Sequence, residues 1–141
     1  MNAAKDIIKQ LNDFGRQSEP FLFIFDFEMT NPVLLSINEV NAEEIRFNIH
    51  GFSNLTSNKP AAKQVDFQKF PITFDQYRQA FNEVTNHIRL GNSYLLNLTF
   101  KTKIQTRLSL PKIFEHSSAP YKLLYKNQFV VFSPEAFVKI E

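Results

Sequence analysis

The run Tyr121-Lys122-Leu123-Leu124-Tyr125-Lys126-Asn127-Gln128-Phe129-Val130-Val131-Phe132 decides the fold class of this chain. Residues 121–125 and 129–132 are rich in aromatic and aliphatic side chains, and the three polar residues between them are typical of a tight turn. A connection of this length joins neighbouring antiparallel strands, whereas a doubly wound parallel sheet needs a helix between its strands. The sequence therefore predicts an α+β fold, mainly an antiparallel sheet with packed helices.

More strands are expected upstream of this hairpin. Residues 21–27 follow Pro20 as a nearly continuous apolar run, which predicts a central strand buried on both faces. Residues 33–37 and 45–49 predict weaker strands. Residues 51–71 are rich in Ser, Asn, Thr, Lys and Pro, so they predict a long loop or crossover that is poorly ordered around 57–63.

Helical spacing of apolar residues appears in two places. From Ala4 to Phe14 it predicts a short amphipathic helix that ends at Gly15. Thr73 and Gln76 form a capping-box pattern, which predicts a helix over 74–90 that ends before Gly91.

The region after the second helix predicts one more strand and one more helix. Residues 94–100 alternate between apolar and mixed positions, so they predict a strand with one apolar face. Residues 104–108 either extend that strand or pair with it. Ser109 is the expected cap of a short helix that ends at His116.

Length and composition bound the domain organisation. With 141 residues, 43% of them hydrophobic, the chain predicts a single folding unit, with a region of strands and loop over 1–72 and a second region over 73–141. Sixteen Phe and no Trp predict a core dominated by Phe.

Charge and hydropathy argue against two classes of partner. A net charge of +2 is too small to indicate binding to nucleic acid. No apolar run approaches the length of a membrane span. The chain has no cysteine and no recognisable signal segment, which indicates a cytoplasmic protein.

Few residues suggest chemistry by themselves. His50, His87 and His116 are scattered singly, so no metal site is predicted within the chain. In Ser133-Pro134-Glu135 the proline fixes the turn, so the Glu135 carboxylate is held rigidly enough for general acid/base catalysis. An ordinary solvated turn is the commoner interpretation of such a tripeptide.

The end of the chain predicts an interaction between copies. Residues 136–140 alternate after the Ser133-Pro134-Glu135 turn, so they predict a last strand with an open edge. Through that edge we expect the chain to pair with a second copy or to exchange strands with it.

The order of four segments gives the functional assignment. A helix over 74–90 is followed by Gly91-Asn92-Ser93-Tyr94-Leu95-Leu96-Asn97-Leu98-Thr99, then by Ala119-Pro120-Tyr121-Lys122, and last by Phe132-Ser133-Pro134-Glu135-Ala136-Phe137. Over residues 74–141 this order resembles the chorismate-utilising enzymes. Because Asn97 follows Tyr94, the chain is more similar to the component I branch of aminodeoxychorismate synthase, in para-aminobenzoate and folate synthesis, than to anthranilate synthase.

The resemblance implies a function and its residues. It implies an enzyme that binds chorismate with magnesium and replaces its 4-hydroxyl by an amino group, with ammonia from a glutamine amidotransferase subunit. Glu135 matches the family's catalytic glutamate, and Pro120, Tyr121 and Lys122 match a segment that lines a tryptophan pocket. The family's magnesium ligands and chorismate-carboxylate ligands match nothing in this sequence, so we expect an N-terminal portion that is inactive by itself.

Two alternatives stay open at this point. One is a fragment of anthranilate synthase component I. The other is a non-catalytic module that binds tryptophan or a partner, which is favoured by Asn92, Leu95 and Ala136, where the family usually has Asp, Gln and Arg.

Overall fold

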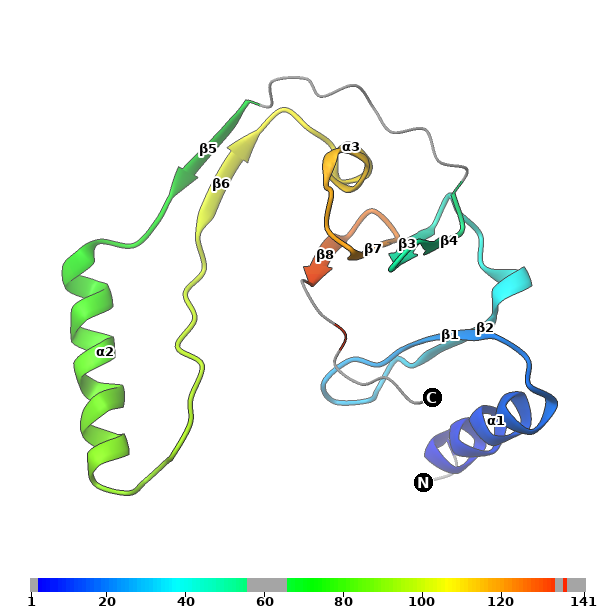
Figure 1. The fold of residues 1–141 in the computed structure, drawn as a ribbon, viewed down its shortest axis with the longest axis horizontal. Coiled ribbons are helices and arrows are strands. Elements are labelled where there is room, and N and C mark those ends of the chain that lie inside the picture. The colour runs from blue at the N-terminus through cyan, green and yellow to red at the C-terminus, as the bar shows by residue number, and fades with distance from the viewer. Residues whose placement is uncertain (1–2, 56–65, 134–135, 137–141) are drawn as a thin grey trace. The chain divides into compact units, whose positions relative to one another are not determined.

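The computed structural model of this protein describes residues 3–55, 66–133 and 136 (Figure 1). Its elements in chain order are α1 (Ala3–Gln17), β1 (Phe21–Ile24), β2 (Val33–Ser36), the 3-10 helix η1 (Ile37–Glu39), β3 (Ile45–Ile49), β4 (Phe52–Ser53), β5 (Phe67–Phe70), α2 (Phe74–Arg89), β6 (Lys103–Thr106), α3 (Leu110–His116), β7 (Tyr121–Tyr125) and β8 (Phe129–Ser133). Every strand pair is antiparallel. The predicted α+β class, mainly antiparallel, is confirmed.

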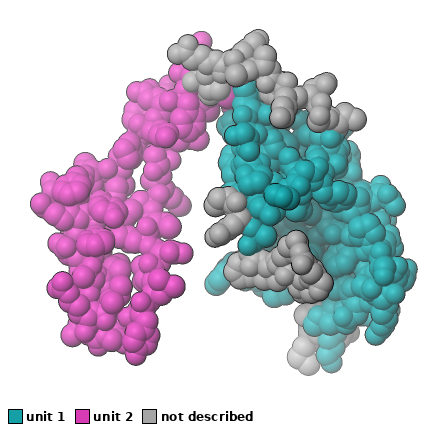
Figure 2. Space-filling view, in the orientation of Figure 1, with its two compact units in different colours: residues 1–61, 109–141 teal, residues 62–108 magenta. Residues whose placement is uncertain are grey.

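The chain divides into two compact units, coloured separately in Figure 2. Unit 1 comprises residues 1–61 and 109–141, and unit 2 comprises residues 62–108. These units follow contacts rather than chain order. The expected regions 1–72 and 73–141 are stretches of sequence, and as domains they stay a prediction.

Unit 1 is built on a four-stranded sheet in the order β4-β3-β7-β8. The predicted hairpin is confirmed, with Tyr125 opposite Phe129 and Tyr121 opposite Ser133. Its turn requires left-handed backbone at Lys126 and Asn127, with φ of 44° and 53°. Asparagine tolerates that conformation better than most residues do, which suits the turn to a hairpin.

Alternation along β3 and β7 gives this sheet two distinct faces. Residues directly opposite in an antiparallel pair point to the same side. Phe47 and Leu123 therefore share one face, which we call the open face, while Arg46 and Leu124 share the other. Helix α3 lies over the second face, which we call the helix face (Figure 1).

The best-buried side chains belong to these elements. Ile45, Phe47, Phe114 and Leu124 are each at most 2% exposed. Two of the four are phenylalanine and two are aliphatic, so phenylalanine shares the centre of the described core with aliphatic side chains rather than dominating it. Many other phenylalanines remain exposed, among them Phe27 and Phe74.

The expectation of a central strand over 21–27 is wrong. Strand β1 stops at Ile24, pairs with β2 in a two-stranded sheet among the described residues, and leaves Phe23 54% exposed. Asp26 ends the strand because its carboxylate accepts hydrogen bonds from the Thr30 hydroxyl at 2.6 Å and the Asn31 backbone at 3.2 Å. This polar turn competes with continued pairing.

Helix α1 also differs from its expected end. It continues through Gly15 to Gln17, and the left-handed residue that follows is Ser18, with φ of 53°. Glycine inside a helix costs only about 1 kcal/mol, so tertiary contacts decide such an end. One such contact is the stacking of Phe14 on Phe21, with ring centroids 5.1 Å apart.

Unit 2 contains helix α2 and the β5–β6 ribbon. The predicted capping box is present, since the Thr73 hydroxyl accepts from the Gln76 backbone at 3.3 Å and the Gln76 side chain accepts from the Thr73 backbone at 3.0 Å. Gly91, with φ of 77°, follows the helix as expected. No helix in the described part of the chain is long and apolar enough to cross a membrane.

Two further expectations about unit 2 need correction. Residues 94–100 form no strand, and β6 pairs with β5 instead of with them. A strand needs a ladder partner, and the described residues supply none beside 94–100. The expected loop over 51–71 contains β4, which belongs to unit 1, and β5, because Phe52 and Ser53 pair with β3 and residues 67–70 pair with β6.

Three expectations remain, which concern the helix after Ser109, the disorder around 57–63 and the strand over 136–140. The short helix after Ser109 is confirmed, although the Ser109 side chain makes no capping hydrogen bond. The expected disorder around 57–63 lies outside the described residues. The expected strand over 136–140 and its open edge lie outside them too, except for Ala136.

Candidate functional site

The four residues that the sequence singled out stand in two different situations. Three of them are described: Pro120 precedes β7, and Tyr121 and Lys122 are the first two residues of that strand. Glu135 lies outside the described residues, so its role stays a prediction. The candidate site is therefore the part of the sheet around β7.

The open face of the unit 1 sheet borders a cavity of about 910 Å³. Pockets that hold small organic ligands have volumes of about 300–1,000 Å³ and are mostly apolar. Strands β3, β7 and β8 supply one side and β1 supplies another. The lining residues are Leu22, Phe23, Ile24, Phe47, Ile49, Tyr121, Lys122, Leu123, Val131, Ser133 and Ala136.

Tyr121 brings an aromatic ring with a polar end to this cavity. It lies opposite Ile49 on β3 and opposite Ser133 on β8, so β7 holds its backbone between two neighbours. The ring also stacks on His50, with centroids 6.0 Å apart and planes inclined by 21°. Such packing fixes the ring and leaves its hydroxyl as a directional group for a ligand.

Pro120 contributes its backbone to the sheet rather than its ring to the cavity. Its carbonyl accepts a hydrogen bond of 2.8 Å from the His50 backbone N–H. Each carbonyl oxygen has two lone pairs, so one remains for a second donor. A ligand ammonium at this segment would have to share that oxygen with His50.

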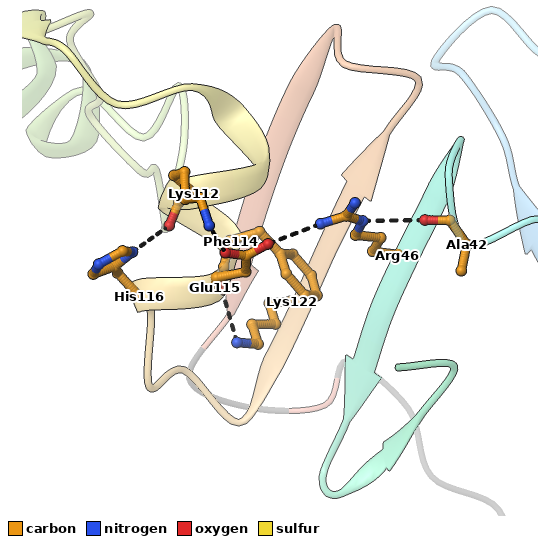
Figure 3. Close-up of polar contacts among 7 residues, drawn as sticks. All are labelled: Ala42, Arg46, Lys112, Phe114, Glu115, His116 and Lys122. Carbon is orange, nitrogen blue, oxygen red and sulfur yellow. Dashed lines mark hydrogen bonds and ion pairs between the residues drawn. The ribbon is translucent and has the colours of Figure 1, made fainter. Parts of the chain in front are cut away.

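The Lys122 side chain is committed to helix α3 on the helix face. Its ammonium donates to the Phe114 carbonyl at 2.8 Å (Figure 3) and lies 4.5 Å from the centre of the Phe114 ring. It also donates to the Ser117 carbonyl at 2.9 Å. The last carbonyls of a helix lack partners and carry partial negative charge, so a cation there is stabilising. Lys122 therefore clamps the end of α3 to β7.

Burial sets the protonation balance of this lysine. Desolvation lowers the pKa of Lys122 below its usual value, and the negative charge of Glu115 opposes that shift. Because the Lys122 ammonium is bound to the end of α3 on the helix face, Lys122 borders the cavity with its backbone.

A second polar cluster joins α3 to β3 (Figure 3). Glu115 forms ion pairs with Arg46 at 3.1 Å and with Lys112 at 2.7 Å. The Lys112 hydrogen bond, with the charges of Lys112 and Arg46, lowers the pKa of Glu115 despite an opposing effect of burial. The Arg46 guanidinium also donates to the Ala42 carbonyl at 3.1 Å.

The sequence interpretation missed this cluster. Lys112 and Glu115 are spaced i, i+3, which is a recognisable helical pair. Nothing local in the sequence connects them to Arg46, because that contact bridges 69 positions. The cluster ties α3 to β3 through ion pairs on the helix face, so we interpret it as a structural feature.

The described residues fit no magnesium site. Nowhere among them do three His, Asp or Glu side chains gather as a metal ion would require. The magnesium that the family resemblance implies therefore stays a prediction.

The family assignment follows from sequence comparison. The model of the family described as chorismate binding enzyme matches residues 10–141. Since this is nearly the whole chain, the protein belongs to the chorismate-binding enzyme family. The resemblance found in the sequence motifs is thereby confirmed.

Two curated relatives extend this result. An uncharacterized PabA-like protein of Haemophilus influenzae is 44% identical over 133 residues, and one of Pasteurella multocida is 40% identical over 134. Each match covers 94% of this chain but only 40% and 41% of the relatives. The chain thus spans about two fifths of their length. No solved structure matches it.

Proposed function

We propose that this chain is part of an aminodeoxychorismate synthase component I. The complete enzyme would convert chorismate and ammonia to 4-amino-4-deoxychorismate, for para-aminobenzoate and folate synthesis in the cytoplasm. The observation that carries the proposal is the family match over residues 10–141. The Asn97 motif and the PabA-like naming of both relatives support the branch.

Glu135 is the proposed general acid and base of this reaction. The carbon–oxygen bond at C4 breaks, a carbon–nitrogen bond forms, and the departing hydroxyl needs a proton to leave as water. To deliver that proton, the Glu135 carboxyl has to be protonated at the working pH, as a general acid must be. Magnesium, bound by residues outside the described part, would supply charge neutralisation for the carboxylates of chorismate.

The proposed source of ammonia is a glutamine amidotransferase subunit. The chain by itself is expected to be inactive, since the chorismate-carboxylate ligands implied by the resemblance match nothing in it. The ammonia source requires the complete enzyme for a direct test, whereas the inactivity is tested on the isolated chain.

The decisive experiment uses a chimera in which this chain replaces the matching 133 residues of the Haemophilus influenzae relative. The chimera is incubated with chorismate, magnesium and ammonium, and the products are separated by chromatography. We expect 4-amino-4-deoxychorismate from the chimera, none from the isolated chain, and a large loss in the Glu135→Gln chimera.

Other product patterns would change the assignment. Formation of 2-aminobenzoate would move the chain to anthranilate synthase. A folded chimera without turnover, beside an active relative, would refute the synthase proposal. Turnover by the isolated chain would refute its expected inactivity.

The cavity on the open face favours a second candidate, a module that binds tryptophan. Its volume, its apolar lining and the ring of Tyr121 suit an indole, and the backbone of Pro120 and Lys122 lies at the segment that the resemblance connects with the ammonium. This function would operate in the absence of chorismate chemistry.

Calorimetric titration of the isolated chain with tryptophan tests this candidate. Tyr121→Ala should weaken binding about tenfold or more, because it removes the aromatic wall of the cavity. Tyr125→Ala is the matched control, since Tyr125 lies on the same strand and face, stacks on Phe129, and is outside the cavity lining. Absence of heat with the wild-type chain removes the candidate.

A further inference from the structure

Residues 94–100 in unit 2 combine two unusual properties. Their large apolar side chains are exposed, with Tyr94 at 92%, Leu95 at 87% and Leu96 at 49%. Their backbone is drawn out between α2 and β6 but belongs to no assigned strand (Figure 1). No backbone-to-backbone hydrogen bond joins residues 94–102 to any other described residue. The sequence nevertheless has the alternation of a strand.

One row of this segment already has a partial covering. Leu96 and Leu98 face Ala80, Val84 and Ile88 of α2 around a hollow of about 410 Å³, and Phe100 meets the Tyr77 ring at 6.0 Å. Helix α2 therefore holds the segment along one side. The Leu95 carbonyl accepts a hydrogen bond of 3.1 Å from the Ser93 hydroxyl, while the other backbone groups make no backbone-to-backbone hydrogen bond and the Leu95 side chain is exposed.

An extended segment of this kind is a template for strand addition. Unpaired N–H and C=O groups in a row accept a neighbouring strand, and the alternating side chains then contribute specificity. The β5–β6 ribbon is also able to accept a further strand, because a two-stranded ribbon has only marginal stability by itself. All its side chains except Thr106 are exposed.

We propose that residues 94–100 form a strand with the region of the relatives that lies outside their match to this chain. More than half of each relative lies outside the match, which is long enough to supply a strand for this edge. The occupant is that region, whether it is joined to this chain or supplied as a separate polypeptide. A second copy and unit 1 of the same chain are the competing occupants.

Hydrogen exchange of the backbone amides tests the proposal without any enzymatic activity. The isolated chain is compared with the same chain mixed with the unmatched region of the Haemophilus influenzae relative, and with the chimera described above. Amides of residues 94–100 should exchange rapidly in the isolated chain at low concentration. They should be protected about a hundredfold or more in the chimera and, where the separate region folds, in the mixture.

A matched pair of variants tests which residues carry the contact. Leu95→Asn should reduce that protection or the association about tenfold, since a buried leucine side chain is lost from the new sheet. Leu90→Asn changes the same residue type at 75% exposure outside the segment, and should alter it less than about twofold. Equal effects would overturn the assignment to 94–100.

The other occupants give distinct results, and each refutes the proposal. Protection that increases with chain concentration would identify a second copy. Protection already present in the dilute isolated chain would identify unit 1. Exchange that stays rapid in a folded chimera would show that this edge receives no strand, even if the chimera converts chorismate.

Discussion

Replacing Lys122 by methionine should destabilise unit 1 through the end of helix α3. The change keeps the unbranched stem beside the Phe114 ring and removes the ammonium. Two hydrogen bonds are lost, of 2.8 Å to the Phe114 carbonyl and 2.9 Å to the Ser117 carbonyl. Both acceptors are among the last carbonyls of a helix, where no intrahelical donor replaces the lysine.

The expected loss follows from the balance of these contacts. A hydrogen bond to a charged group contributes about 1.5–3 kcal/mol, so two of them set an upper bound of about 6 kcal/mol. The ammonium is desolvated at this position, which lowers its pKa and offsets part of that gain. We expect a net decrease of about 2 kcal/mol in the free energy of unfolding.

Urea unfolding followed by far-ultraviolet circular dichroism measures this loss in a chain that has no tryptophan. Lys112→Met is the matched control, because it removes an ammonium from the same helix at a site that is 59% exposed. An exposed pair of this kind contributes up to about 0.5 kcal/mol. If Lys122→Met stays within about 0.5 kcal/mol of the wild type, or if both variants lose equally, the clamp has no energetic role.

Three further predictions concern stability. Thr73→Ala removes the capping box of α2 and should cost about 1 kcal/mol, seen as reduced helical circular dichroism on mild heating; unchanged ellipticity would contradict it. Asn54→Ala should cost about 2 kcal/mol in urea, because the Asn54 side chain bonds the Phe47 N–H at 3.0 Å and the Ile45 carbonyl at 2.7 Å, and an equal midpoint would count against that role. The pKa of Glu115 is lowered on folding, so its stabilisation is present above its ordinary value near 4.5 and is lost as the pH falls through the folded value. The wild type should therefore lose stability below about pH 4.5 more steeply than Glu115→Gln, and parallel pH profiles would exclude Glu115 as the cause.

Local patterns in the sequence were sufficient wherever one element decides its own structure. The 121–132 hairpin, the capping box at Thr73 and the helix after Ser109 each depend on neighbouring residues, and all three are present. The sequence failed where the outcome depends on distant partners. Residues 94–100 have the alternation of a strand without a ladder partner in the described structure, and 21–27 has the composition of a central strand without a central place.

The same reasoning applies to the candidate site. The segment 120–122 lies beside a cavity, and its role in binding stays a prediction; composition could not separate the positions of its three residues. Tyr121 lines the cavity on the open face, whereas the Lys122 side chain leaves on the helix face and meets Phe114. That distinction depends on the β7 register and on α3, which packs from elsewhere in the sequence.

The two faces of the unit 1 sheet therefore differ in what they contact: one holds helix α3, and the other borders the cavity. On the helix face, Arg46 and Lys122 bind α3 through Glu115 and through the carbonyls of Phe114 and Ser117. On the open face, Phe47, Tyr121 and Leu123 leave a mostly apolar cavity without such commitments. Because adjacent residues of one strand point in opposite directions, we expect a change at Lys122 to act on stability and a change at Tyr121 to act on the cavity. A ligand for this fold is therefore to be sought on the open face, where the side chains can change partners without releasing the helix.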